Sequence, residues 1–246
     1  KTLFPPWLQE GGVEAMITRL ADDNVRNRLR TALEAEGLNN FGRIPDWDAI
    51  RISISPDMPQ YAGRTIADIA AERNIDGFNM ALDYIVEDRG QTRVLVGSIA
   101  ENDVKDFVRS PDVMIGSDGN SVAPYGTTGQ GKPHPRFYGT FAKVLGQYAR
   151  DEELLPLHQA VWKMTGASAR ALGLKNRGTL QPGNAADITI FDPVTIAEQA
   201  TYEDPHQFAS GIHQVIVNGT TVLRDGEHTG ALAGRTLRRQ TDFAAA

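Results

Sequence analysis

The sequence predicts an α/β fold with a parallel sheet, followed by a small β module. Between residues 48 and 172, short alternating or apolar runs are interleaved with stretches in which apolar residues recur every three to four positions. Strands separated by helices in this way are typical of a parallel sheet with crossover helices. After Gly173 only strand patterns follow, and Asn218-Gly219 separates two alternating runs as a hairpin turn does. The β module is expected to extend over residues 177–235.

Two helices precede the first strand. The first is expected over residues 13–20 and the second over residues 24–36, where apolar residues form one stripe and Gly37 ends the helix. The other faces of both helices are rich in arginine and glutamate. Residues 1–47 are therefore predicted to be a helical insertion or lid.

The elements after this insertion follow from local patterns. Isoleucines at three alternate positions predict a strand over residues 48–55. Thr65 and Asp68 match the capping box that begins a helix. The remaining predictions are strands at 93–98 and 186–192, and helices at 65–73, 78–88, 101–109, 137–150, 157–165 and 168–172. Residues 236–246 are expected to be a frayed tail.

Asp118 is the first candidate for a functional residue. The apolar run at 113–115 predicts a buried strand, and Asp118 would follow its carboxyl end, where parallel α/β proteins carry catalytic groups. Gly116 and Gly119 leave room for a ligand or a metal ion to approach the backbone. The alternative is that Asp118 only caps the next turn.

A long loop follows over residues 119–136. It is rich in glycine and small polar residues, and loops of this length are often functional. At its far end, Arg136 offers a planar fork that pairs bidentately with a carboxylate, although a surface ion pair is an equal alternative. His134 and Tyr138 are further candidates for substrate contacts. For His134, a hydrogen bond that packs the loop is the favoured interpretation.

The composition excludes several classes of protein. The chain has 246 residues and a formal net charge of −6, which argues against non-specific nucleic-acid binding. It has no run of 18 apolar residues, so no membrane span is expected. Without cysteine it can contain no disulfide, thiol nucleophile or thiolate ligand. The first residues lack the apolar core of a secretory signal, and a cytoplasmic location is expected.

The histidines do not form a metal-binding pattern. None of the five is part of an H-x-H or H-x-x-x-H pair, whereas a catalytic zinc site normally needs three protein ligands. About three parallel strands are predicted before the β module, whereas a (β/α)₈ barrel needs eight. We therefore expect neither a complete metal site nor a self-sufficient fold from this chain alone.

Four motifs stand out in the middle of the chain: Met114-Ile115-Gly116-Ser117-Asp118-Gly119, His134-Pro135-Arg136, Tyr138-Gly139-Thr140-Phe141 and Val144-Leu145-Gly146. Together they resemble the carboxyl-terminal half of the N-acyl-D-amino-acid deacylases (D-aminoacylases). The opening Pro5-Pro6-Trp7 resembles the start of that family's helical insertion. Arg177-Gly178-Thr179-Leu180 and Ala186-Asp187-Ile188 resemble the exit from barrel to β-sandwich in the amidohydrolase superfamily, which includes hydantoinases and dihydroorotases.

The resemblance implies a metal-dependent (β/α)₈ TIM barrel with a small β-sandwich domain. Residues 48–176 would form the carboxyl-terminal barrel portion and residues 177–235 the β-sandwich portion. The implied reaction is the zinc-dependent hydrolysis of N-acyl-D-amino acids to a D-amino acid and a carboxylate. Asp118 matches the aspartate that contacts the metal, takes a proton from the attacking water and passes it to the leaving amine. Arg136 matches the arginine that holds the substrate α-carboxylate.

The chain also departs from the family pattern. The family's H-x-H pair, bridging cysteine and two further histidine ligands lie upstream of the matching segment, and this chain contains none of them. We therefore expect the amino-terminal half of the enzyme, as a separate polypeptide, to be a partner. The alternatives are a cyclic-amide hydrolase of the hydantoinase type and a non-catalytic assembly or binding subunit. Arg136 favours an open-chain substrate, because a hydantoin ring has no free carboxylate.

Overall fold

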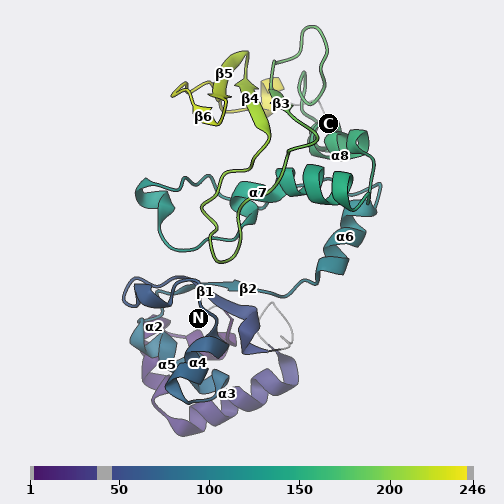
Figure 1. The fold of residues 1–246 in the computed structure, drawn as a ribbon. Coiled ribbons are helices and arrows are strands. Elements are labelled where there is room, and N and C mark those ends of the chain that lie inside the picture. Colours follow the sequence, from purple (N-terminus) through teal and green to yellow (C-terminus); the bar gives the residue numbers. More distant parts are fainter. Residues whose placement is uncertain (1–2, 38–45, 243–246) are drawn as a thin grey trace. The chain divides into compact units, whose positions relative to one another are not determined.

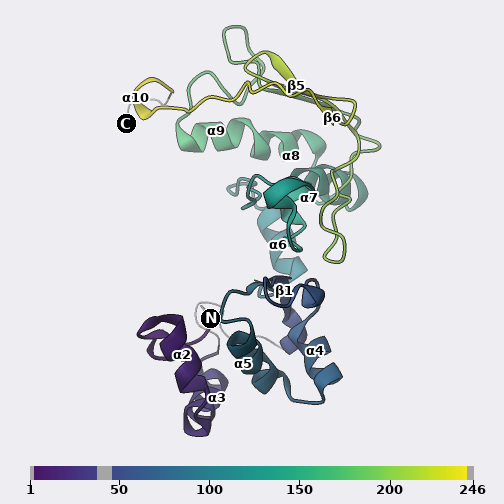
Figure 2. The same cartoon turned by 90° about the vertical axis from the view of Figure 1, so that its left-hand side faces the viewer.

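The structure is a computed structural model that describes residues 3–37 and 46–242, except for the side chains of residues 239 and 240. It divides the chain into two compact units, and Figures 1 and 2 show the elements of each from two sides. Unit 1 comprises the described parts of 1–100, 123–134 and 202–204, and unit 2 those of 101–122, 135–201 and 205–246.

Unit 1 is made of helices and a two-stranded sheet. Its elements are α1 (Pro6–Gln9), α2 (Gly12–Leu20), α3 (Asp23–Glu36), η1 (Trp47–Ala49), β1 (Ile50–Ile54), η2 (Pro59–Tyr61), α4 (Ile66–Arg73), α5 (Gly77–Glu87), β2 (Arg93–Val96) and η3 (Gly126–Gly129). One core includes Leu20 and Leu29 from the predicted insertion together with Ile52, Ile69 and Leu82. The helices of the predicted insertion therefore share their core with residues 48–100.

Local signals placed the helix ends of unit 1 correctly. Gly37 follows α3 with a φ of +80°, and its N–H donates to the Leu33 carbonyl at 2.8 Å. The capping box at the start of α4 is complete, because the Asp68 N–H donates to the Thr65 hydroxyl and the Thr65 N–H donates to the Asp68 carboxylate, each at 3.0 Å.

Unit 2 contains the remaining helices and a four-stranded sheet. Its elements are α6 (Glu101–Arg109), α7 (Arg136–Lys143), the π-helix η4 (Val144–Asp151), α8 (Leu157–Met164), α9 (Gly166–Leu172), β3 (Ile188–Phe191), β4 (Ile212–Val217), β5 (Thr220–Arg224), β6 (Glu227–His228) and α10 (Arg239–Asp242). Helices α8 and α9 follow one another in line (Figure 2). The core of this unit includes Val108, Leu145, Tyr148, Ala160 and Ile196.

The β module contains the predicted hairpin. Its strands pair in the order β3-β4-β5-β6, and all neighbours are antiparallel. Between β4 and β5, Asn218 and Gly219 have φ angles of +48° and +80°, and two such residues in succession are what a type I′ turn requires. The hairpin prediction is confirmed.

The predicted parallel pairing of strands and the predicted strand at 113–115 are both wrong for the described residues. Strands β1 and β2 pair antiparallel, so the described sheets contain no parallel pair. Residues 113–117 form no strand, although the Ile115 N–H donates to the Lys163 carbonyl at 3.3 Å. An apolar run favours extended backbone, but a strand also needs a neighbour to pair with, and sequence pattern does not supply that information.

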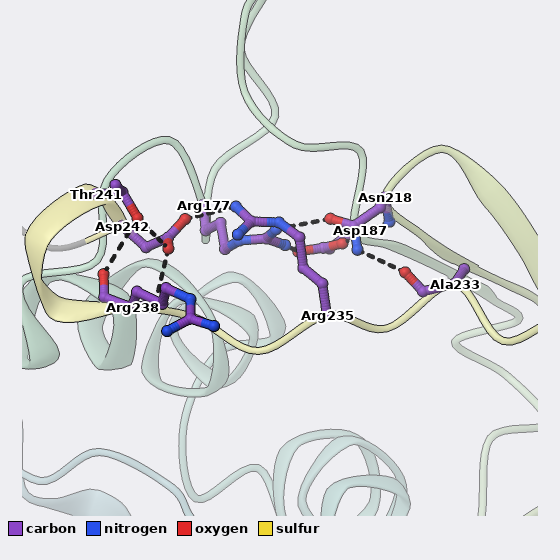
Figure 3. A network of polar contacts seen from close by, with 8 residues as sticks. All are labelled: Arg177, Asp187, Asn218, Ala233, Arg235, Arg238, Thr241 and Asp242. Carbon is purple, nitrogen blue, oxygen red and sulfur yellow. Dashed lines mark hydrogen bonds and ion pairs between the residues drawn. The ribbon is translucent and has the colours of Figure 1, made fainter.

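The end of the described chain is held more firmly than predicted. Asp242, the last described residue, is buried and accepts hydrogen bonds from Arg235 and from the backbone N–H of Arg238 (Figure 3). The frayed tail was therefore the wrong expectation for this part, while residues 243–246 lie outside the described residues. No described helix is long and apolar enough to cross a bilayer, and the cytoplasmic location stays a prediction.

A second part of the same network holds the turn of the hairpin. Arg177 pairs with the Asp187 carboxylate and donates to the Asn218 side-chain oxygen at 2.6 Å (Figure 3). The side-chain amide of Asn218 donates to the Ala233 carbonyl at 2.7 Å, and the backbone N–H of Asn218 donates to the Asp187 carboxylate at 2.9 Å. Arg177 and Asp187 come from the motifs that resemble the superfamily's barrel exit, and their contacts here are structural.

Candidate functional site

Asp118 lies in an unusual backbone conformation. Its φ of +47° is in the left-handed region, which non-glycine residues seldom adopt and which asparagine and aspartate tolerate best. The Ser117 hydroxyl accepts from the Gly119 N–H at 3.1 Å and closes the turn around Asp118. A Cβ on residue 119 would lie 3.2 Å from Phe137 Cα, so glycine permits the turn to approach α7 closely. Left-handed backbone at a polar side chain is found often at functional sites.

Arg136, the first residue of α7, pairs with Asp118. One guanidinium nitrogen, Nη2, lies 2.7 Å from the Asp118 carboxylate, and Nε donates to the Asp118 carbonyl at 3.2 Å. The Asp118 side chain is 87% exposed and that of Arg136 is 40% exposed. The structure therefore brings the two principal candidates together in an accessible position.

Tyr138 lies two residues further along α7. Its hydroxyl and His206 Nδ1 are 2.8 Å apart and hydrogen bonded. The tyrosine ring also contacts Phe208 edge to face, with 5.8 Å between the ring centres. Burial raises the pKa of the Tyr138 hydroxyl, so it stays protonated at neutral pH. Tyr138 belongs to unit 2, as do Asp118 and Arg136.

His134 belongs to unit 1. Its Nε2 is hydrogen bonded to the Tyr202 hydroxyl at 2.9 Å, and the two rings meet edge to face. The Arg51 guanidinium lies over the Tyr202 ring, and Lys132 donates to the Glu203 carbonyl at 2.5 Å. His134 thus makes the loop-packing hydrogen bond that the sequence favoured, and its role towards a substrate stays a prediction.

Several partners of the candidate residues were not found from the sequence. Tyr202 and His206 lie 68 residues from the side chains they bind, and no local pattern connects them. Lys163 was also missed, although a signal existed. It lies three residues after Ala160, on the buried face of α8, where a lysine is rare unless its ammonium group is paired.

A separate group of titratable side chains connects α6 with η4. The Tyr148 hydroxyl donates to Glu101 at 2.6 Å, and Lys105 pairs with Glu152 at 2.8 Å. Burial, and then the neighbouring Glu101, raises the pKa of Tyr148, and burial raises the pKa of Glu198. These contacts hold the first turns of α6, the helix that precedes the Asp118 segment.

The described residues do not fit a metal site by themselves. Among residues 3–37 and 46–242, no group of three or more histidine, aspartate or glutamate side chains is arranged to hold a metal ion. Asp118 is the predicted metal ligand, and its carboxylate is paired with Arg136. The described residues alone therefore supply no complete set of three such ligands.

The chain is similar to known amidohydrolases along most of its length. Residues 6–223 match the family described as "Amidohydrolase family". The D-aminoacylase of Alcaligenes xylosoxydans xylosoxydans is 42% identical over 181 residues, which cover 74% of this chain and 35% of that protein. This chain therefore spans about a third of the length of that relative.

Solved structures give the same result. A crystal structure of D-aminoacylase, described as defining a novel subset of amidohydrolases, aligns with a TM-score of 0.67 at 41% identity, covering 77% of this chain and 38% of that one. An N-acyl-D-glutamate deacylase from Bordetella bronchiseptica, complexed with zinc and a phosphonate inhibitor that mimics the tetrahedral intermediate, aligns with a TM-score of 0.63 at 37% identity. It covers 73% of this chain and 35% of that structure.

Proposed function

The chain belongs to the amidohydrolase family, and we propose that it forms part of an enzyme that hydrolyses N-acyl-D-amino acids. The products are a D-amino acid and a carboxylate. The similarity to D-aminoacylase and to N-acyl-D-glutamate deacylase supports this substrate class. The observation on which the proposal rests is the pairing of Asp118 with Arg136.

In the proposed reaction, Asp118 is the general base. Its carboxylate takes a proton from the attacking water and returns it to the amine as the amide bond breaks. A carboxylate suits this role when it is accessible, and the Asp118 side chain is almost fully exposed. Asparagine at this position could not accept the proton.

Arg136 binds the substrate α-carboxylate in this proposal. In an N-acyl-amino acid only the amide nitrogen and Cα separate the carbonyl carbon from the carboxylate carbon. The base and the group that binds the carboxylate must therefore lie close together, as Asp118 and Arg136 do at 2.7 Å. Guanidinium has five N–H donors in a rigid fork, which allows it to contact two carboxylates at once. Tyr138 and His134 are proposed to contribute to substrate binding.

We further propose that the enzyme is zinc-dependent, that Asp118 contacts the zinc ion, and that the other zinc ligands lie outside the described residues. The similarity to a zinc-containing deacylase supports this, as does the small share of the relatives' length that the chain spans. In this proposal the chain contributes the carboxyl-terminal part of a (β/α)₈ barrel and part of a β-sandwich. The amino-terminal half is supplied as a second polypeptide.

The substrate class is tested by assaying the natively purified protein with an N-acetyl-D-amino acid, its L-enantiomer and a hydantoin. The proposal expects cleavage of the D-enantiomer and little or none of the other two. Cleavage of the hydantoin instead would indicate the cyclic-amide alternative. A zinc-containing preparation that cleaves none of the three would indicate a non-catalytic subunit. Intact mass under denaturing conditions tests for a second polypeptide in the same sample.

A further inference from the structure

Lys163 is buried in unit 2 and is not part of the pair that Asp118 and Arg136 form. It lies near the end of α8, and the residue is only 4% exposed. Burial lowers the pKa of its ammonium group, while Asp112 acts in the opposite direction. A buried lysine is costly unless its ammonium group is hydrogen bonded, so the contacts that it makes have to be favourable.

The ammonium group binds the carboxyl-terminal end of α6. Nζ donates to the Val108 carbonyl at 2.6 Å and also to the Ser110 carbonyl. The last carbonyls of a helix have no partner within the helix, and the partial negative charge there favours a cation. Lys163 therefore fixes the point at which the chain leaves α6.

The backbone of the same residue binds the chain a few residues later. The Lys163 carbonyl accepts from the Ile115 N–H at 3.3 Å and from the Ser168 hydroxyl at 2.8 Å. One residue thus holds the segment 108–115 at both ends. Asp118 follows only three residues after Ile115, and residues 113–117 have no strand partner among the described residues that could place them instead.

We propose that Lys163 is a positioning residue that places Asp118 for the reaction. It acts through the segment 108–115 and does not contact the substrate. This inference rests on the proposed function of Asp118. It predicts that loss of the ammonium group lowers kcat, because a displacement of about 1 Å at a reacting group can reduce the rate about 100-fold. Substrate binding by Arg136 should change little, because Arg136 is carried by α7.

The test compares Lys163→Met with Lys105→Met in the natively purified protein. Lys105 lies on α6, the helix whose end Lys163 contacts, and pairs with Glu152, so its variant removes a lysine ion pair that involves no residue of the 108–118 segment. For Lys163→Met we expect kcat to fall about 10- to 100-fold with KM within about 3-fold. Lys163→Arg, which keeps the charge and the donors, should recover part of kcat. Lys105→Met should keep both constants.

Hydrogen exchange gives a measurement that does not depend on activity. The amides of residues 112–118 should exchange faster in Lys163→Met than in Lys105→Met. If Lys163→Met does not fold, Lys163→Gln takes its place, because its shorter amide cannot reach both carbonyls. Unchanged kcat and unchanged exchange in the folded variant would overturn the positioning role. If Asp118→Asn keeps full activity, the proposed role of Asp118 in the reaction is wrong. Faster exchange of residues 112–118 in Lys163→Met would still show that Lys163 holds this segment in place.

Discussion

Asp88 offers the clearest prediction of stability in unit 1. Its side chain is fully buried at the end of α5. One carboxylate oxygen accepts from the Ser55 hydroxyl at 2.7 Å and from the Asp57 N–H at 3.3 Å, and the other accepts from the Thr92 hydroxyl. The carboxylate thus connects the segment after β1 with the segment before β2.

Replacing Asp88 with alanine leaves these donors without their acceptor. A buried donor without a partner costs about 1–3 kcal/mol. The Ser55 hydroxyl is buried, so its loss of a partner should contribute the full amount, and the half-buried Thr92 should contribute part of it. Asp57 is exposed, so its N–H can bind water instead. The expected loss is about 2–4 kcal/mol, which lowers the melting temperature by roughly 5–15 °C for a protein of this size.

The assay is thermal and urea unfolding of the natively purified protein. Asp88→Asn keeps one acceptor and should lie between wild type and Asp88→Ala. Asp57→Ala removes an exposed carboxylate two residues from Ser55 and should stay within about 0.5 kcal/mol of wild type. If Asp88→Ala unfolds with the same free energy as Asp57→Ala, the carboxylate does not hold these two segments together.

Three further predictions concern a helix cap, the tail and the substrate. Thr65→Ala should lower the free energy of unfolding by about 1 kcal/mol, because α4 loses its capping box. Thr65→Ser should recover most of this loss, and unchanged stability of Thr65→Ala would contradict the prediction. The hydrogen bond from Arg235, and to a lesser extent that from the Arg238 N–H, lowers the pKa of Asp242. The ionised Asp242 carboxylate therefore stabilises the tail fully above the ordinary aspartate pKa of about 4, and this stabilisation is lost progressively as the pH falls below that value. Arg235→Met should therefore speed proteolysis of the tail at pH 7 and have a smaller effect near pH 2, where part of the stabilisation is already lost; equal rates at pH 7 would contradict this. Arg136→Lys should raise KM for an N-acyl-D-amino acid about 10- to 100-fold by loss of a charged hydrogen bond, and an unchanged KM would show that another residue binds the carboxylate.

The local parts of this structure could be predicted from the sequence. The capping box of Thr65 and Asp68, the end of α3 at Gly37 and the Asn218-Gly219 hairpin depend only on neighbouring residues. The candidate site could be predicted in part, because Asp118 and Arg136 lie at the two ends of one loop and their opposite charges bring them together.

The parts that depend on distant residues could not be predicted. The pairing of β1 with β2 was expected to be parallel and is antiparallel, because apolar alternation indicates a strand but not its neighbour. The apolar run at 113–115 predicted a strand for the same reason, but residues 113–117 have no strand neighbour among the described residues. The contacts of Tyr138 with His206 and of Lys163 with Val108 connect residues 68 and 55 positions apart, and no periodic pattern contains them.

Replacement of Asp118 by asparagine tests the proposed reaction most directly. The natively purified variant is assayed with an N-acyl-D-amino acid beside Asp103→Asn, which removes an exposed carboxylate from α6. If Asp118 is the general base, kcat falls by about 100-fold or more in Asp118→Asn and is unchanged in Asp103→Asn. If Asp118→Asn keeps kcat within about 3-fold of wild type, proton transfer does not pass through Asp118 and the proposed mechanism is wrong.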